Sequence, residues 1–262
     1  MGLIGLTSTR GAPGVTTTAL GLALAWHRPV LLVEADVAAG SAILAGYLRG
    51  TMPHDRGLRD VATAISMGEP LDEAINASLI DLPGGRVRLL PGLTSASQAP
   101  VVGGAWEPLA AHLRDLHDAG MDVIVDLGRW GARHGPEPLL PYLDLLLLAI
   151  SSDLPGVHAA RGWVPVLRAE LDTLGRGSDA LRALVVGPGR PYSTREIAAA
   201  LELPVLGDLA WDPPTAAVLS HGAPQHRNAA RAPLGRDLTA LAAATAAAVR
   251  DRTSTDAGEV LA

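Results

Sequence analysis

The amino-acid sequence predicts a single α/β domain with a doubly wound, mainly parallel sheet and helices on both faces. Three observations lead to this prediction. Short apolar runs alternate with longer segments of helical period. The runs are almost continuously apolar, which is typical of strands buried on both faces. The chain has 262 residues, 48% of them hydrophobic, and no break in composition divides it, so one large core can form.

Each predicted strand is a run rich in Val, Leu and Ile that is bounded by turn-forming residues. The predicted strands are Leu3–Thr7, Val30–Glu34, Val87–Leu90, Asp122–Leu127, Leu145–Ile150, Ala183–Val186 and Val205–Leu209. The segments between them have helical periodicity. The predicted helices are Thr16–His27, Ser41–Leu48, Leu58–Ser66, Leu71–Ile75, Trp106–Ala119, Gly156–Leu174, Ser193–Leu201, Pro214–His221 and Leu234–Arg250.

Two segments are predicted to lack regular structure. Residues 92–104 are rich in Ser, Gly and Ala, which favours a loop. Residues 253–262 are small and polar, so we expect the domain to comprise residues 1–252 and the remainder to form a flexible C-terminal tail.

The composition excludes several kinds of chemistry. The chain has no Cys, which excludes disulfides and thiolate sites and fits a reducing cytoplasm. It also has no Lys, and all 21 of its basic residues are Arg. A net charge of −6 argues against attraction of nucleic acid by the whole surface. We expect a cytoplasmic protein, since no signal peptide or transmembrane segment is visible.

The stretch "STRGAPGVTTTALGLA", residues 8–23, has the order of a phosphate-binding turn: a strand, then glycines, then the start of a Thr-rich helix. Backbone N–H groups at a helix N-terminus bind phosphate whatever the side chains are. Val15, however, stands where such loops normally carry lysine, so one cation is lost. The alternative to a phosphate-binding turn is a glycine turn that only begins a buried helix.

This stretch resembles the deviant P-loop of the ParA/MinD ATPases, of general form K-G-G-x-G-K-T-T. Arg10 takes the place of the family's signature lysine, which contacts phosphate across a dimer. Val15 replaces the loop lysine. The resemblance implies that ATP would contact Arg10, Gly11, Ala12, Pro13, Gly14, Val15, Thr16 and Thr17.

Other segments resemble the same family in the same order. In "VLLVEADVAAG", Glu34 and Asp36 match its two acids, and the second, Asp36, would orient the attacking water. In "MDVIVDLGRW", Asp126 matches the Walker B acid, so Thr16 and Asp126 would hold Mg²⁺. "LELPVLGDLAWDPPTAAVLSHGAP" resembles the family's C-terminal segment. The alternative is that Asp36 and Asp126 only cap the helices that follow them.

The departures from the family pattern guide the functional prediction. The loop lysine is missing, and "VVGPGRP" has Gly187 or Pro188 where the family often has an Asn that contacts adenine. We therefore predict a degenerate positioning or scaffold protein, similar to the TadZ/CpaE-like branch, that binds ATP and Mg²⁺ weakly or not at all. One alternative is a slow ATPase that uses Arg10 instead of the loop lysine. Another is a small-molecule ligase resembling dethiobiotin synthetase, which would need that lysine.

The resemblance also implies partners. We expect a homodimer that recruits a protein of a pilus, secretion, partitioning or division machinery. Whether the dimer is itself recruited to a membrane-bound assembly or cell pole is left open. The arginines near the C-terminus leave a weak DNA contact open, although a solvated face is the simpler interpretation. The last residues of the sequence lack large apolar side chains at helical spacing, so we expect no basic amphipathic helix of the kind by which MinD binds membranes.

Overall fold

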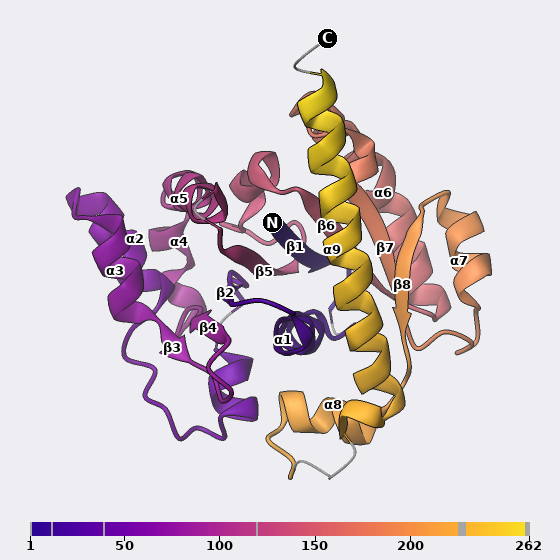
Figure 1. Cartoon of the computed structure of the whole chain (residues 1–262), viewed down its shortest axis with the longest axis horizontal. Coiled ribbons are helices and arrows are strands. Elements are labelled where there is room, and N and C mark those ends of the chain that lie inside the picture. Colours follow the sequence, from indigo (N-terminus) through magenta and orange to yellow (C-terminus); the bar gives the residue numbers. More distant parts are fainter. Residues whose placement is uncertain (1, 12, 39, 119, 225–228, 260–262) are drawn as a thin grey trace.

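The computed structural model describes residues 2–11, 13–38, 40–118, 120–224 and 229–259. Its centre is an eight-stranded sheet in the order β3-β4-β2-β5-β1-β6-β7-β8. Every neighbouring pair is parallel except the short antiparallel pair β3–β4. Helices cover both faces of the sheet (Figure 1). The predicted fold class is therefore confirmed.

The strands follow the apolar runs closely. They are β1 (Leu3–Ser8), β2 (Val30–Glu34), β3 (Ile80–Asp81), β4 (Val87–Leu90), β5 (Asp122–Arg129), β6 (Leu145–Ser151), β7 (Leu181–Val186) and β8 (Val205–Leu209). The α-helices are α1 (Val15–Ala25), α2 (Leu58–Met67), α3 (Leu71–Ser78), α4 (Ala99–Val102), α5 (Trp106–Asp118), α6 (Leu154–Thr173), α7 (Thr194–Leu201), α8 (Pro213–Ser220) and α9 (Pro233–Glu259). A π-helical turn covers Ile43–Tyr47, and 3₁₀ turns cover Ala96–Gln98, Glu137–Tyr142, Ser178–Ala180 and Ala229–Arg231.

The structure differs from the predicted elements in several places. The helix predicted at Ser41–Leu48 is only a π-helical turn at Ile43–Tyr47. The two-residue strand β3 was not predicted, because it is too short to show periodicity and is held by its pairing with β4. The loop predicted at 92–104 is partly wrong, since it contains a 3₁₀ turn and α4, which has Pro near its first position. Helix α9 continues past its predicted end at Arg250, through much of the expected tail, to Glu259.

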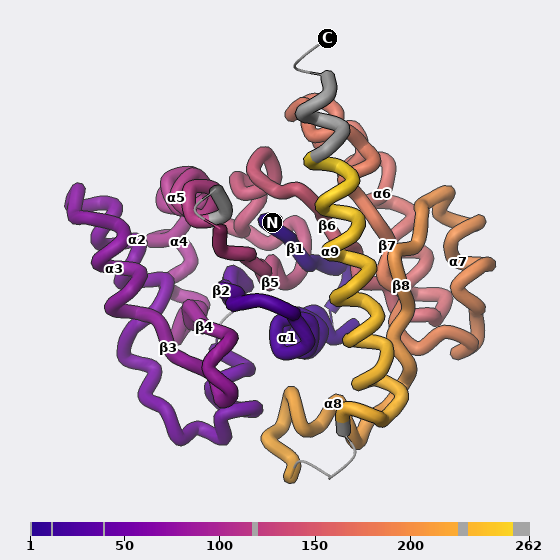
Figure 2. The backbone as a smooth tube through the Cα atoms, viewed as in Figure 1, coloured from indigo at the N-terminus to yellow at the C-terminus, as the bar shows by residue number. Residues whose placement is uncertain are grey.

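Two buried clusters fill the layers between the sheet and the helices. Along β2 the side chains alternate between them: Leu31 and Val33 pack on the α2–α7 side, and Leu32 packs on the side of α1, α8 and α9. Helix α1 lies close beside α9 (Figure 2). A Cβ atom at Gly21 would lie 2.6 Å from Leu238 of α9, so glycine permits this close approach. No helix in the described part of the chain is long and apolar enough to cross a bilayer.

The sheet order brings the predicted site segments together. Strand β1 lies between β5 and β6, and β2 lies on the other side of β5. Leu6 is the register partner of Asp126, and Glu34 pairs with the same residue from the opposite side. Because these strands are parallel, the turns that follow them meet at one edge of the sheet, where open α/β sheets usually bind ligands.

Candidate functional site

The turn after β1 begins α1 in the way that a phosphate turn requires. Gly14 has φ +83°, a left-handed conformation that favours glycine, and its carbonyl accepts a hydrogen bond from Thr18 N at 2.8 Å. The Ser8 hydroxyl donates to the Arg10 carbonyl at 2.8 Å and thereby tightens the turn. Within the described residues α1 has no side-chain N-cap and no acidic residue in its first turn. Its first N–H groups therefore remain available to an anion.

A cavity of about 440 Å³ opens at this turn. The predicted residues that line it are Gly11, Pro13, Gly14, Val15, Thr16, Thr17 and Asp36. Arg10 is exposed and is not part of the lining. Ala12 lies outside the described residues. The turn is thus neither collapsed nor filled by a side chain, and it leaves room for an anion.

Val15 occupies the lysine position with an apolar side chain. It is 7% exposed and belongs to the buried cluster on the α1 side of the sheet. Val15 is also among the residues that line the cavity. The cavity therefore offers backbone donors and hydroxyls without the usual loop cation, and the basic residue that does line it is Arg129, at the end of β5.

Asp126 is buried on β5 and is not itself among the residues that line the cavity. Its carboxylate accepts hydrogen bonds from Gly128 N at 3.0 Å and from the Thr16 hydroxyl. Burial raises the pKa of Asp126 to about 6, and the nearby charge of Asp36 adds to the rise. The structure thus brings together Thr16 and Asp126, the two residues predicted to hold a metal ion.

Asp36 follows β2 and reaches the same cavity. Its Oδ1 accepts from Ala38 N at 2.8 Å. Its carboxyl group lies against Gly128, whose φ is +62° and which has no space for a Cβ atom. Asp36 and Asp126 each bond to the N–H two residues further on, in local turns. These bonds do not match the alternative that both acids only cap the following helices.

Glu34, at the end of strand β2, is a third acid of the site. The sequence alone does not show that its carboxyl group is buried or that its pKa is raised. It is 4% exposed and accepts hydrogen bonds from Gly92 N at 3.3 Å and Ile43 N at 3.4 Å. Burial raises the pKa of Glu34 to about 7, with a further contribution from the charge of Asp126. Two adjacent buried carboxyl groups therefore hold protons more tightly than exposed ones.

The residues present fit a magnesium ion. The described residues contain no group of three or more His, Cys, Asp or Glu side chains that would enclose a metal ion. Mg²⁺ needs no such cage, because it usually keeps several waters and is held by one or two protein oxygens together with phosphate. Asp126 and Thr16 supply that kind of partial site beside the turn.

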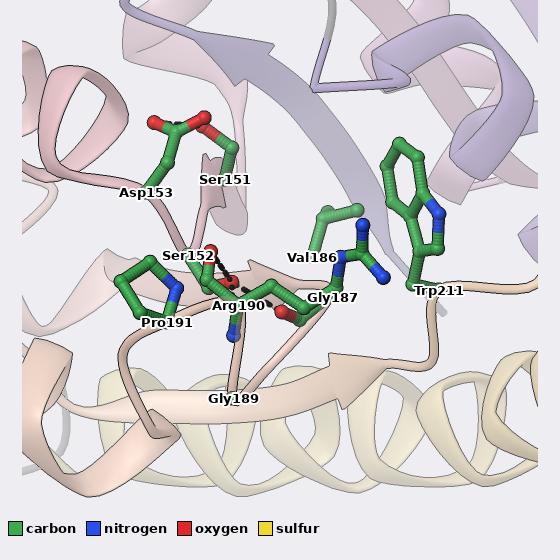
Figure 3. Close-up of a pocket in the computed structure, with 9 residues that line it drawn as sticks. All are labelled: Ser151, Ser152, Asp153, Val186, Gly187, Gly189, Arg190, Pro191 and Trp211. Carbon is green, nitrogen blue, oxygen red and sulfur yellow. Dashed lines mark hydrogen bonds between the residues drawn. The ribbon is translucent and has the colours of Figure 1, made fainter.

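Two further cavities extend the site along the same edge. One, of about 540 Å³ and mostly apolar, shares Pro13, Gly14 and Thr17 with the turn and reaches Trp211. The other, of about 550 Å³, is lined by the ends of β6 and β7 together with Arg190 and Trp211 (Figure 3). Sequence reasoning noted the missing Asn at Gly187 but missed Arg190 and Trp211. Nothing in a single sequence shows that these two residues lie close together.

The sheet order and the helices on both faces define a doubly wound α/β protein. The chain has the fold of the MinD and ParA ATPases, as solved structures show. It is similar to the cell division ATPase MinD of Pyrococcus furiosus, with a TM-score of 0.72 and 18% identity over 94% of this chain and 98% of that one.

Two other structures are similar to the same extent. Apo McdA of Cyanothece has a TM-score of 0.71 and 17% identity, over 94% of this chain and 99% of that one. A ParA family ATPase of Chlorobium tepidum has a TM-score of 0.70 and 14% identity, over 92% and 97%. Neither a protein-family model nor a curated protein sequence matches the chain.

Proposed function

We propose that this chain is a degenerate member of the ParA/MinD family that positions or scaffolds a protein partner. It binds Mg²⁺–ATP weakly at the turn after β1 and hydrolyses it very slowly or not at all. The observation that carries this proposal is the open cavity at Gly14 from which the loop cation is missing, since Val15 is buried there. The TadZ/CpaE-like branch is the branch that we favour.

Nucleotide binding is supported by two similar structures: MinD of Pyrococcus horikoshii was solved with Mg-ADP and a variant of Cyanothece McdA with ATP. In this chain the N–H groups of the first turn of α1 would hold the phosphates. Thr16 and Asp126 would hold Mg²⁺, which neutralises phosphate charge when it is bound. Asp36 would orient a water molecule, because its carboxylate lines the same cavity.

Slow turnover follows from the distribution of charge. Phosphoryl transfer needs cations where negative charge develops in the transition state, and Val15 supplies none. Backbone donors remain for the ground state. We therefore expect that having Val15 in place of the loop lysine lowers the hydrolysis rate more than it lowers the affinity for nucleotide.

A partner-binding role is supported by the solved complex of MinC with MinD from Aquifex aeolicus. We propose that this chain likewise forms a homodimer and recruits a protein to a cell pole or membrane-bound assembly. The position of Arg252 argues against DNA binding near the C-terminus. Its side chain is 10% exposed and pairs with Asp179, so it is not free to meet phosphate.

A slow ATPase is the second candidate. Arg10 is exposed and does not line the cavity of its own chain, which leaves it accessible to a second copy. A guanidinium group binds phosphate oxygens well and could replace the loop lysine across a dimer. The ligase alternative gains no support, because it would need the loop lysine itself, and the only basic residue among the described residues that line the cavity is Arg129, which follows β5 rather than the turn.

Equilibrium titration of ATP and ADP, with and without Mg²⁺, tests the nucleotide site. We expect Val15→Lys to tighten binding of Mg²⁺–ATP about tenfold or more, since a charge-assisted hydrogen bond contributes about 1.5–3 kcal/mol. Val15→Met is the matched control, because it has similar length without charge and should give no such gain. Hydrolysis by the unchanged chain at ordinary family rates, abolished by Asp36→Ala, would contradict the proposal.

A further inference from the structure

Arg129, the last residue of β5, carries a positive charge at the edge of the cavity beside the phosphate turn. The residue is exposed, although the seven residues before it on the strand are all buried. Within the described part of the chain its guanidinium group has no hydrogen bond and no ion pair. Its five N–H donors are therefore available to an anionic ligand.

A β-bulge in β5 brings Arg129 to this cavity. Leu127 packs on the α2–α7 side of the sheet, and because side chains alternate along a strand, Arg129 would be expected on that side too. Between its pairings with Leu6 and Ser8, however, β5 has one residue more than β1. The extra residue reverses the alternation, so that Trp130 packs on the α2–α7 side and Arg129 lines the cavity.

The backbone on both sides of Arg129 is held in place. The Thr7 hydroxyl donates to the Gly128 carbonyl at 3.0 Å, and the N–H of Trp130 donates to a carbonyl of β1 at 2.8 Å. A Cβ atom at Gly128 would lie 2.3 Å from Cγ of Asp36, so the bulge requires glycine and lies directly against that acid. Arg129 therefore extends from a fixed backbone position next to Asp36.

The charges around the cavity favour an anion beside Arg129. Arg129 and Asp36 are the charged residues among the described residues that line it, and buried Asp126 lies nearby. Two carboxylates would repel phosphate where Val15 supplies no cation, so Arg129 and a bound Mg²⁺ are the charges that offset this repulsion. The N–H groups of α1 hold the phosphates at the turn, and Arg129 lies at the Asp36 end of the same cavity.

We propose that Arg129 binds the terminal phosphate of ATP and thereby makes this chain prefer ATP to ADP. The inference rests on the proposed nucleotide site, in which Asp36 acts at the same end. A guanidinium group presents paired donors that match two phosphate oxygens. Arg129 approaches from β5 and not from the turn, so it does not replace the loop lysine, which reaches the phosphates from the turn itself. The slow turnover proposed above is therefore still expected.

Calorimetric titration of the full chain tests the inference, with the Mg²⁺ complexes of ADP and of the non-hydrolysable β,γ-imido analogue of ATP as probes. We expect Arg129→Ala to weaken binding of the ATP analogue about tenfold or more, the effect of losing a charge-assisted hydrogen bond. The affinity for ADP should stay the same, because ADP has no terminal phosphate at this position.

An Arg129→Ala variant that binds the ATP analogue as the unchanged chain does would overturn the assignment and leave the proposed nucleotide site standing. Equal weakening of both nucleotides would overturn it in the same way. If the unchanged chain binds neither nucleotide, the assignment is wrong together with the proposed site.

Two further variants separate a phosphate contact from a general effect of charge. Arg133→Ala removes an exposed arginine of the turn that follows β5, which does not line the cavity, and it should leave both affinities unchanged. Arg129→Lys keeps the charge without the planar fork, so it should retain part of the preference for the ATP analogue. A loss in Arg133→Ala as large as that in Arg129→Ala would show that net charge alone is responsible, and the proposal would be wrong.

Discussion

At the scale of single residues, the ionisation of Glu34 depends on contacts that are distant in sequence. The carboxyl group is surrounded by Ile43, Gly92 and the strand that carries Asp126. Removal of water raises its pKa because the charged form loses solvation that hydrogen bonds from the Ser41 side chain and from the Gly92 and Ile43 backbone only partly replace. The sequence predicts that an acid lies here, but its burial is a property of the folded chain.

This burial predicts a pH dependence of stability. The pKa of Glu34 is about 7 in the folded chain and 4.5 as its ordinary value, so the folded state binds the proton more tightly. The stability that Glu34 contributes is therefore fully present below pH 4.5, falls between pH 4.5 and 7, and is absent above that. Since one pKa unit corresponds to about 1.4 kcal/mol, the loss is on the order of 3 kcal/mol.

Glu34→Gln should remove this loss, because a neutral amide of the same shape does not ionise. Urea unfolding at pH 5 and pH 8, without Mg²⁺ or nucleotide, checks the expectation. The variant should gain stability relative to the unchanged chain at pH 8 and little at pH 5. Glu107→Gln, at an exposed position on α5, accounts for the general effect of removing a carboxylate. A Glu34→Gln variant that is less stable at pH 8 would contradict the argument.

At the scale of elements, strands are predicted well where hydrophobicity alone decides them. The central strands are buried on both faces, so their runs of Val, Leu and Ile stand out, and Val30–Glu34 and Val87–Leu90 match their predicted bounds. Strand β3 and helix α4 depend on tertiary contacts and contain few residues, so no periodicity reveals them. The length of α9 depends on where its C-terminal half docks.

Arg252 explains how α9 is held beyond its predicted end. Its Nε donates to the Asp144 carbonyl at 2.9 Å, and its Nη2 donates to the Arg176 carbonyl at 2.6 Å. The same guanidinium group pairs with Asp179. These contacts join the helix to the edge of the sheet opposite the phosphate turn.

Arg252→Ala should lower the free energy of unfolding by about 1–3 kcal/mol, because two backbone carbonyls and a carboxylate lose their donor. Arg236→Ala is the matched control, since Arg236 lies exposed on the same helix, and a surface change there should stay within about 0.5 kcal/mol. Urea unfolding gives both values. Equal midpoints for the two variants would show that α9 docks through its apolar face alone.

At the scale of the whole molecule, the order of the strands explains why the site could be predicted in part. The turn residues and Asp36 follow strands, and Asp126 lies near the end of β5; a parallel sheet places these strands side by side, so their order in the sequence is enough to predict that the residues meet. Arg190 and Trp211 follow β7 and β8, and their contact depends on the path of an irregular loop. Backbone-defined features of the site are therefore predictable, whereas side-chain contacts between loops are not.

Oligomeric state distinguishes a scaffold from a slow ATPase. Arg10 is exposed beside the turn and lies outside the cavity lining of its own chain. If the chain is a scaffold with weak nucleotide affinity, Arg10→Ala should leave its dimerisation unchanged with or without Mg²⁺–ATP, because no phosphate links the two copies. Analytical ultracentrifugation over a range of concentrations measures this, with Arg195→Ala as a control for the loss of one exposed arginine. A dimer that forms only with Mg²⁺–ATP and that only Arg10→Ala abolishes would instead support an arginine that contacts phosphate from the second copy.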